Sequence, residues 1–240
     1  MNTVMKFAVP LAGVLLLGAV FLTGCSSGPK PPDWQLEAKG SMERSVAAYM
    51  EGNSRVEMAE LGRARSQLAR TGRADLMATA ELLHCAIRVA SLVFEPCAGF
   101  EKLRQDAPEA QRAYADYLRG QLPPQSIALL PAPQRAAAAS GAGAVQGIAD
   151  PLSQLVAAGV QLQTGKASPA VMAQATDTAS SQGWRRPLLA WLNVQAQRAE
   201  QGGDVQEAAR LRRRIALAEQ TQGSASSSKS PSKETAKENP

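Results

Sequence analysis

Residues 74–94 read ADLMATAELLHCAIRVASLVF, and this stretch decides the fold class. Its apolar residues return at alternating steps of four and three, which places them on one face of a helix. The stripe consists of Leu76, Ala80, Leu83, Ile87, Ala90 and Phe94. We therefore expect a helix near 73–94 that buries one face against neighbouring elements.

Helix signals continue on both sides of this stretch. Ser54 to Glu57 and Asp204 to Glu207 have the form of capping boxes, and Asp150 and Ser168 each precede a proline suited to a first helical turn. Glycines near the expected ends supply stop signals. The predicted helices span residues 36–51, 54–71, 73–94, 98–105, 108–119, 133–140, 151–164, 169–182, 186–201 and 204–221.

Composition and loop length extend this pattern to the whole fold. Helix-forming residues are abundant, aromatic residues make up 4% of the chain, and no segment alternates with the period of a strand. Short loops between helices of similar length force neighbours to run antiparallel. The sequence thus predicts an all-α protein of antiparallel helical hairpins, either tetratricopeptide-like or irregular.

One long connection interrupts the array. Residues 121–148 are rich in Pro, Ala and Gly, and they separate an N-terminal helical lobe (35–120) from a C-terminal one (149–222). We expect either a hinge or a proline-bounded helix packed across both lobes. GAGAVQG at 141–147 lacks a preceding strand and the glycine spacing of a dinucleotide site, so we interpret it as a flexible connector.

The first residues are predicted to contain a localisation signal. An apolar run from Phe7 to Leu22 follows Lys6, which is typical of a secretory signal, here 1–24. It ends in FLTGCSS, and Leu22 to Cys25 resembles the lipobox of bacterial lipoproteins. The resemblance implies a diacylglycerol thioether and an N-acyl group on Cys25, and no other cofactor is expected. Two or more acyl chains are needed for stable membrane anchoring.

The flanking segments complete this prediction. Ser26 and Ser27 after the cysteine imply, by the same resemblance, sorting to the periplasmic face of the outer membrane in a Gram-negative host. Residues 25–34 are expected to form a flexible tether. The tail 223–240 has no large apolar residue and is expected to be disordered.

Lipidation of Cys25 leaves two cysteines, Cys85 and Cys97. An even number in an oxidising compartment predicts a disulfide between them, and two separate buried thiols are the alternative. His84 is the single histidine, and the chain offers too few soft ligands for a tetrahedral metal site. We therefore expect no metal and interpret His84 as structural.

The last hairpin resembles part of a tetratricopeptide repeat. Residues 203–208, GDVQEA, are similar to the turn between the helices of that family, and Leu192, Ala196 and Ala199 stand at its small and apolar positions. The resemblance implies a scaffold that binds peptides or partner proteins.

Two arginine-rich segments are candidate partner-binding residues. The first contains Trp184, Arg185 and Arg186, and the second contains Arg210, Arg213 and Arg214. Aromatic and guanidinium groups are enriched in binding hot spots, and the two segments lie one hairpin apart. The alternative is that Trp184 packs against a loop and that most of the arginines form a solvated face.

These features favour a binding protein over an enzyme. The net charge of +5 is small and dispersed, so no nucleic-acid partner is expected. The leading hypothesis is a non-enzymatic adaptor for an envelope protein complex, held at the membrane by its lipid anchor. A binder of peptidoglycan or anionic lipid is the alternative, and a cell-wall hydrolase with two carboxylates is a remote third.

Overall fold

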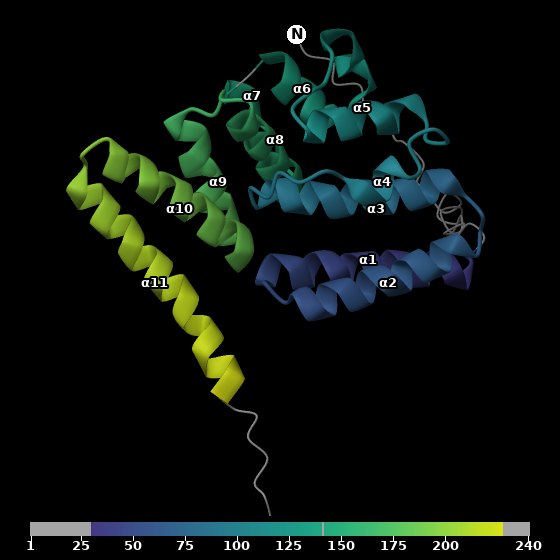
Figure 1. The fold of residues 1–240 in the computed structure, drawn as a ribbon, viewed down its shortest axis with the longest axis horizontal. Coiled ribbons are helices and arrows are strands. Elements are labelled where there is room, and N and C mark those ends of the chain that lie inside the picture. The colour runs from purple at the N-terminus through teal and green to yellow at the C-terminus, as the bar shows by residue number, and fades with distance from the viewer. Residues whose placement is uncertain (1–29, 141, 228–240) are drawn as a thin grey trace, which may run out of the picture. The chain divides into compact units, whose positions relative to one another are not determined.

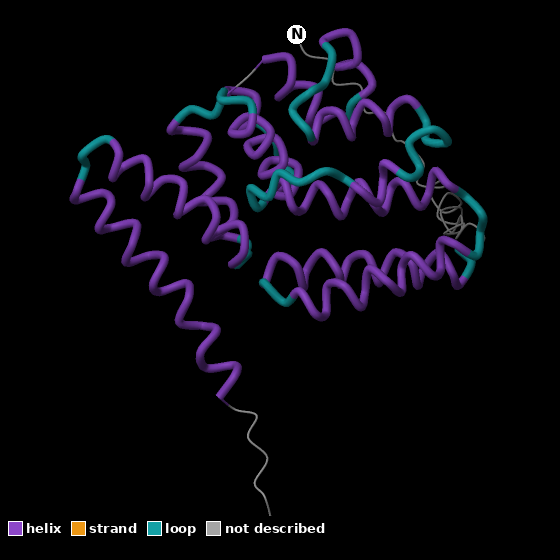
Figure 2. Tube along the Cα trace, in the orientation of Figure 1, coloured by secondary structure: helices purple, strands orange, loops and turns teal. Residues whose placement is uncertain are grey.

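The computed structural model describes residues 30–140 and 142–227, and all regular secondary structure in these ranges is helical (Figures 1 and 2). This confirms the predicted all-α class of antiparallel helical pairs. The elements are α1 (Asp33–Glu51), α2 (Ser54–Ala69), α3 (Ala74–Ala90), α4 (Ala98–Glu101), α5 (Glu109–Leu118), the 3-10 helix η1 (Pro124–Leu129), α6 (Ala132–Ser140), α7 (Ala142–Gln146), α8 (Pro151–Gln163), α9 (Pro169–Ser181), α10 (Arg185–Gln201) and α11 (Val205–Ser227).

The first hairpin, α1 with α2, closes through a short turn (Figure 1). Gly52 has a φ of +92°, which a residue with a side chain rarely adopts. The Asn53 side chain accepts a hydrogen bond from the Val56 amide at 3.2 Å. Asn53 therefore caps α2, and Ser54 of the predicted capping box is already the first helical residue.

The decisive helix, α3, packs against α8, α5, α4 and the first hairpin. Ala80, Ile87 and Ala90 of the predicted stripe are buried. The helix ends at Ala90 and not at 94, because Leu92 adopts a φ of +61° and the Val93 amide donates to the Arg88 carbonyl at 2.9 Å. Phe94 lies beyond this turn and is exposed, so its predicted place on the buried stripe is wrong.

The C-terminal helices pack in chain order, α8 with α9, α9 with α10 and α10 with α11. The predicted starts of α8 and α9 are confirmed, and α10 and α11 each begin one residue away from the predicted 186 and 204. The side chains of Asp150, Ser168 and Asp204 accept hydrogen bonds from the amides three residues later, at 2.7, 3.3 and 2.9 Å.

The connector contains three short helices, of which the sequence predicted the one near 133–140. Residues 124–129, 132–140 and 142–146 form η1, α6 and α7, and Leu130, Ala137 and Val145 are buried in the main core. The Gln154 side-chain amide donates to the carbonyls of Val145 and Ile148 at 3.2 and 3.3 Å. The helix predicted near 133–140 is present as α6, in line with the proline-bounded alternative, and the expectation of a flexible connector, made for 141–147, is wrong for α7 because Val145 is buried and its carbonyl is hydrogen-bonded.

The two predicted lobes share one hydrophobic core. That core draws buried residues from Tyr49 in α1 to Trp191 in α10. The indole of Trp191 donates to the Ala90 carbonyl at 3.1 Å, which ties α10 to the end of α3. The division at 121–148 is thus not a division into two separate cores.

The ends of the chain differ from their predictions where the structure describes them. α1 begins at Asp33, inside the predicted tether, and α11 continues to Ser227, past the predicted start of the tail. The signal peptide, Cys25 and residues 228–240 lie outside the described residues. None of the described helices combines the length and hydropathy needed to cross a bilayer.

Candidate functional site

Arg185 and Arg186 bind the C-terminal end of α1. Arg185 donates from Nε and Nη2 to the Glu51 carbonyl at 3.1 and 2.8 Å. Arg186 donates to the Tyr49 carbonyl and to the Ser54 hydroxyl, both at 2.7 Å. Cationic side chains stabilise the negative end of the helix dipole. Both guanidinium groups are therefore engaged in contacts within the chain.

The same junction includes two aromatic rings. The Arg186 guanidinium lies over the Tyr49 ring, 4.3 Å from its centroid, in a cation–π contact. Trp184 precedes α10, its backbone amide donates to the Ala179 carbonyl at 2.9 Å, and its half-buried ring packs against the main core. This geometry favours the packing interpretation of Trp184.

The α11 arginines differ in their contacts. Arg210 makes two hydrogen bonds to Glu207, each 2.6 Å, and this guanidinium lowers the pKa of the Glu207 carboxyl. The charge of Arg214 acts in the same direction. Arg213 is exposed, and its side chain has no hydrogen-bond or ion-pair partner among the side chains that the structure describes, residues 30–140 and 143–220. Its guanidinium is therefore available to an external partner.

The two predicted arginine sets do not meet. Arg212 pairs with Glu200 and hydrogen-bonds to Asn193, which shows that this part of α11 lies beside the C-terminal half of α10. Arg186 lies near the start of α10, about 10 Å along the helix from Asn193. The six candidate residues therefore form two separate groups.

Cys85 and Cys97 lie in disulfide geometry. Cys85 is in α3, Cys97 precedes α4, and their Cα atoms are 5.8 Å apart, within the usual range for a bridge. The bond would fasten the segment after α3 back onto that helix.

Three buried glutamates join α2 to its neighbours; the sequence predicted only Glu57 among them, and as part of a capping box. Each is less than one tenth exposed and faces a cationic or imidazole partner. The pairs are Glu57 with His84, Glu60 with Arg44 and Arg63, and Glu81 with Arg65. The Glu81 pair is bidentate, with distances of 2.6 and 2.7 Å. The Nε2 atom of His84 lies 3.1 Å from Oε1 of the Glu57 carboxylate, which agrees with the structural interpretation of His84.

A search of the described residues for three or more clustered His, Cys, Asp or Glu that could hold a metal finds no such group. The buried carboxylates are engaged in the pairs above, which is the usual arrangement of structural ion pairs. We assign no residues to hydrolytic chemistry.

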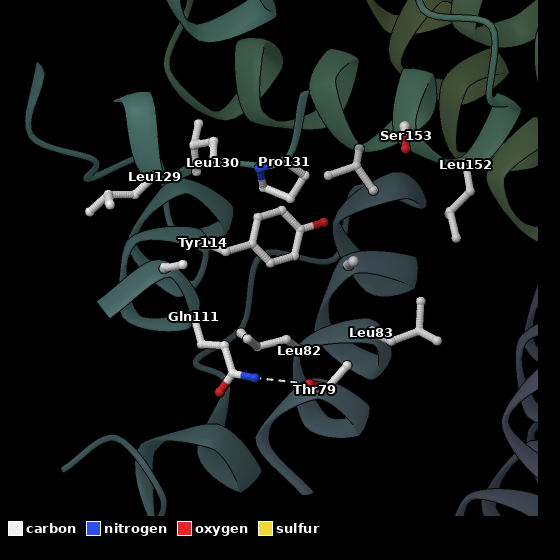
Figure 3. A pocket seen from close by; sticks show the side chains of 13 residues that line it. Thr79, Leu82, Leu83, Gln111, Tyr114, Leu129, Leu130, Pro131, Leu152 and Ser153 are labelled. Carbon is white, nitrogen blue, oxygen red and sulfur yellow. Dashed lines mark hydrogen bonds between the residues drawn. The ribbon is translucent and has the colours of Figure 1, made fainter. Parts of the chain in front are cut away.

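An apolar cleft of about 530 Å³ lies between α3, α5, α8 and the η1–α6 segment (Figure 3). Five of its thirteen lining residues are leucines, and Leu82, Leu129 and Leu152 come from three different elements. Tyr114 of α5 lines it, and its hydroxyl points away from Leu129 in Figure 3. A cleft of this size and lining has the character of a small-molecule site.

No protein family, curated protein or solved structure matches this chain. The function therefore has to be argued from the residues and their geometry.

Proposed function

We propose that the chain is an outer-membrane lipoprotein whose helical domain acts on the periplasmic side as a non-enzymatic adaptor for an envelope protein complex. The lipobox-like segment ending at Cys25 supports the anchor and the address. The geometry of Cys85 and Cys97 supports an oxidising compartment, because disulfides persist there.

One surface carries the adaptor proposal. Val205, Ala209, Arg213 and Leu217 follow each other at steps of four on α11, so they share one helix face. All four are exposed, and Ala208, Leu211 and Ile215 on another face of α11 are buried. We call the exposed set the α11 outer row.

The composition of this row is that of a binding surface. Val205 and Leu217 are 76% and 68% exposed, the highest values among the exposed large apolar residues of the described chain. Arg213 lies between them without a partner of its own. Arginine is among the residue types that contribute most to protein interfaces, and Val205 and Leu217 place exposed apolar surface on either side of it. The partner therefore meets α11 with an apolar surface and an acidic group.

Affinity purification from detergent extracts tests the proposal. The lipidated wild-type chain should retain a stoichiometric protein partner, and Arg213→Glu should lose it. Arg55→Glu, an exposed arginine on α2, is the matched control and should keep the partner. Absence of any stoichiometric partner with the wild-type chain would contradict the adaptor role.

The proposed lipid anchoring at the membrane is tested separately. Cys25→Ser removes the acceptor of the lipid, so the variant should leave the membrane fraction. A variant that still fractionates with outer membranes would contradict the lipid anchor.

Binding to peptidoglycan or anionic lipid remains a second candidate function. Its arginine surface is smaller than the sequence suggested. Arg185 and Arg186 are engaged with α1, which leaves the α11 arginines for such contacts. Co-sedimentation of the wild-type chain with anionic vesicles or peptidoglycan, abolished by high salt and by Arg213→Glu, would favour this candidate.

A further inference from the structure

The cleft between α3, α5 and α8 offers polar groups as well as an apolar wall. The hydroxyls of Tyr114 and Ser153 line it, and neither has a hydrogen-bond partner in the described part of the chain (Figure 3). Thr79, also in the lining, is engaged with Gln111 at 2.9 Å and with the Asp75 carbonyl. Two unused hydroxyls thus remain in a mostly apolar cleft, together with the buried Oε1 of Gln111, which has no partner among the described residues.

The electrostatics of the cleft disfavour anions. Apart from Tyr114, none of the described residues in its lining is ionisable. Burial, and secondarily the Asp150 carboxylate, raise the pKa of the Tyr114 phenol, so the hydroxyl stays neutral and can donate. Asp150 caps α8 directly beside Ser153, at the amide of that residue. A buried anion would meet this negative charge, and no cationic side chain is among the lining residues to compensate it.

We propose that this cleft is a binding site for an uncharged, largely apolar small molecule carrying one hydroxyl or comparable hydrogen-bonding group. Its apolar body lies against the leucines of α3, η1 and α8, and its polar group meets the hydroxyls of Tyr114 and Ser153. The volume of about 530 Å³ lies within the range of small-molecule pockets. This site is separate from the α11 outer row and independent of the adaptor role.

Methyl NMR on the full chain tests the site with a defined probe, 1-naphthol. Saturable shifts are expected at the methyl groups of Leu82, Leu83 and Leu152. Those of Leu36 and Leu217, exposed residues outside the lining, should not move. Partition of the probe into detergent produces no such residue-specific pattern.

Related compounds test which charge and hydrogen-bonding groups the cleft accepts in a ligand. 1-Naphthoate carries a negative charge and should bind at least about tenfold more weakly than 1-naphthol. This difference corresponds to roughly 1.4 kcal/mol of binding free energy. Tyr114→Phe should lower the affinity for 1-naphthol by about fivefold, the net contribution of one hydrogen bond, and leave the affinity for naphthalene unchanged. Equal affinity for 1-naphthoate and 1-naphthol would overturn the assignment to an uncharged ligand.

Matched variants test the location. Ala110 lines the cleft and is exposed, so Ala110→Phe fills the mouth without disturbing the core and should abolish the shifts. Ala59→Phe, at an exposed position on α2, should leave them intact. Persistence of the shifts in Ala110→Phe, or their absence in the wild-type chain, would overturn the proposal. Cleft shifts that depend on protein concentration without any probe would assign the cleft to a second copy of the chain instead.

Discussion

Arg186 shows how one residue joins segments that are far apart in the sequence. It donates to the Tyr49 carbonyl and to Ser54, and it lies over the Tyr49 ring. The planar fork of arginine makes several directed contacts at once, which a lysine ammonium does not reproduce. The junction between α1 and α10 depends on this geometry as well as on the charge.

Arg186→Lys is therefore expected to destabilise the fold although it keeps the charge. The lost hydrogen bonds and ring contact should lower the free energy of unfolding by about 1–2 kcal/mol, measured by urea denaturation. Arg213→Lys is the matched control and should change it by less than about 0.5 kcal/mol, because Arg213 has no contact to lose. Equal effects of the two substitutions would contradict the role given to Arg186.

The sequence could identify Arg185 and Arg186 as noteworthy but could not assign their role. Their partners at Tyr49, Glu51 and Ser54 are more than a hundred residues away, so no local pattern reports the contact. The sequence could not distinguish Arg213 from these two arginines, yet its side chain has no partner in the described part of the structure. The difference between a structural and an available arginine lies in tertiary packing.

At the scale of the elements, local signals predicted most helix starts and failed where tertiary contacts intervene. Asp150 and Ser168 cap their helices as predicted, because a cap is a contact within one turn. The end of α3 was missed because Leu92 takes a left-handed conformation, for which the sequence contains no glycine signal. Helix α7 was missed because the burial of Val145 outweighs the weak helix preference of its glycine-rich segment.

The crossing of α3 and α8 depends on Gly159. A Cβ added there would collide with the Val89 carbonyl, so the two helix backbones approach closely at this point. Gly159→Ala should destabilise the fold by about 1–3 kcal/mol, the cost of overpacking. Gly62, inside α2, has open space around it, and Gly62→Ala should stabilise by about 0.5–1 kcal/mol. Thermal and urea unfolding of both variants checks the opposite signs, and a shared sign would contradict this account.

The bridge between Cys85 and Cys97 links α3 to the segment before α4. Replacing both cysteines by serine should lower the free energy of unfolding by about 3 kcal/mol, as expected for a loop of this length. Mass spectrometry of the unreduced protein should show one linked species. Recovery of both thiols in alkylatable form would contradict the bridge.

At the scale of the whole molecule, one core joins helices that the sequence divided between two lobes. Composition identified residues 121–148 as unusual, but the burial of Leu130 and Ala137 depends on α8 and α5, which no local pattern can report. The all-α class was accessible from periodicity alone. The sharing of one core was not.

A shared core predicts cooperative unfolding. The urea transitions followed by far-UV circular dichroism and by tryptophan fluorescence, to which the buried Trp191 contributes, should coincide. Two separate transitions would indicate that residues 35–120 and 149–222 unfold independently, against the main core that they share.

The central functional claim is that the α11 outer row is where a partner protein binds. Ala209 lies within this row and is exposed, so a photoreactive residue can replace it without loss of packing. Crosslinking in cells should give one discrete adduct from position 209, lost when Arg213→Glu is added, and none from the control position 59 on α2. No adduct at position 209, or the same adducts at both positions, would contradict the claim.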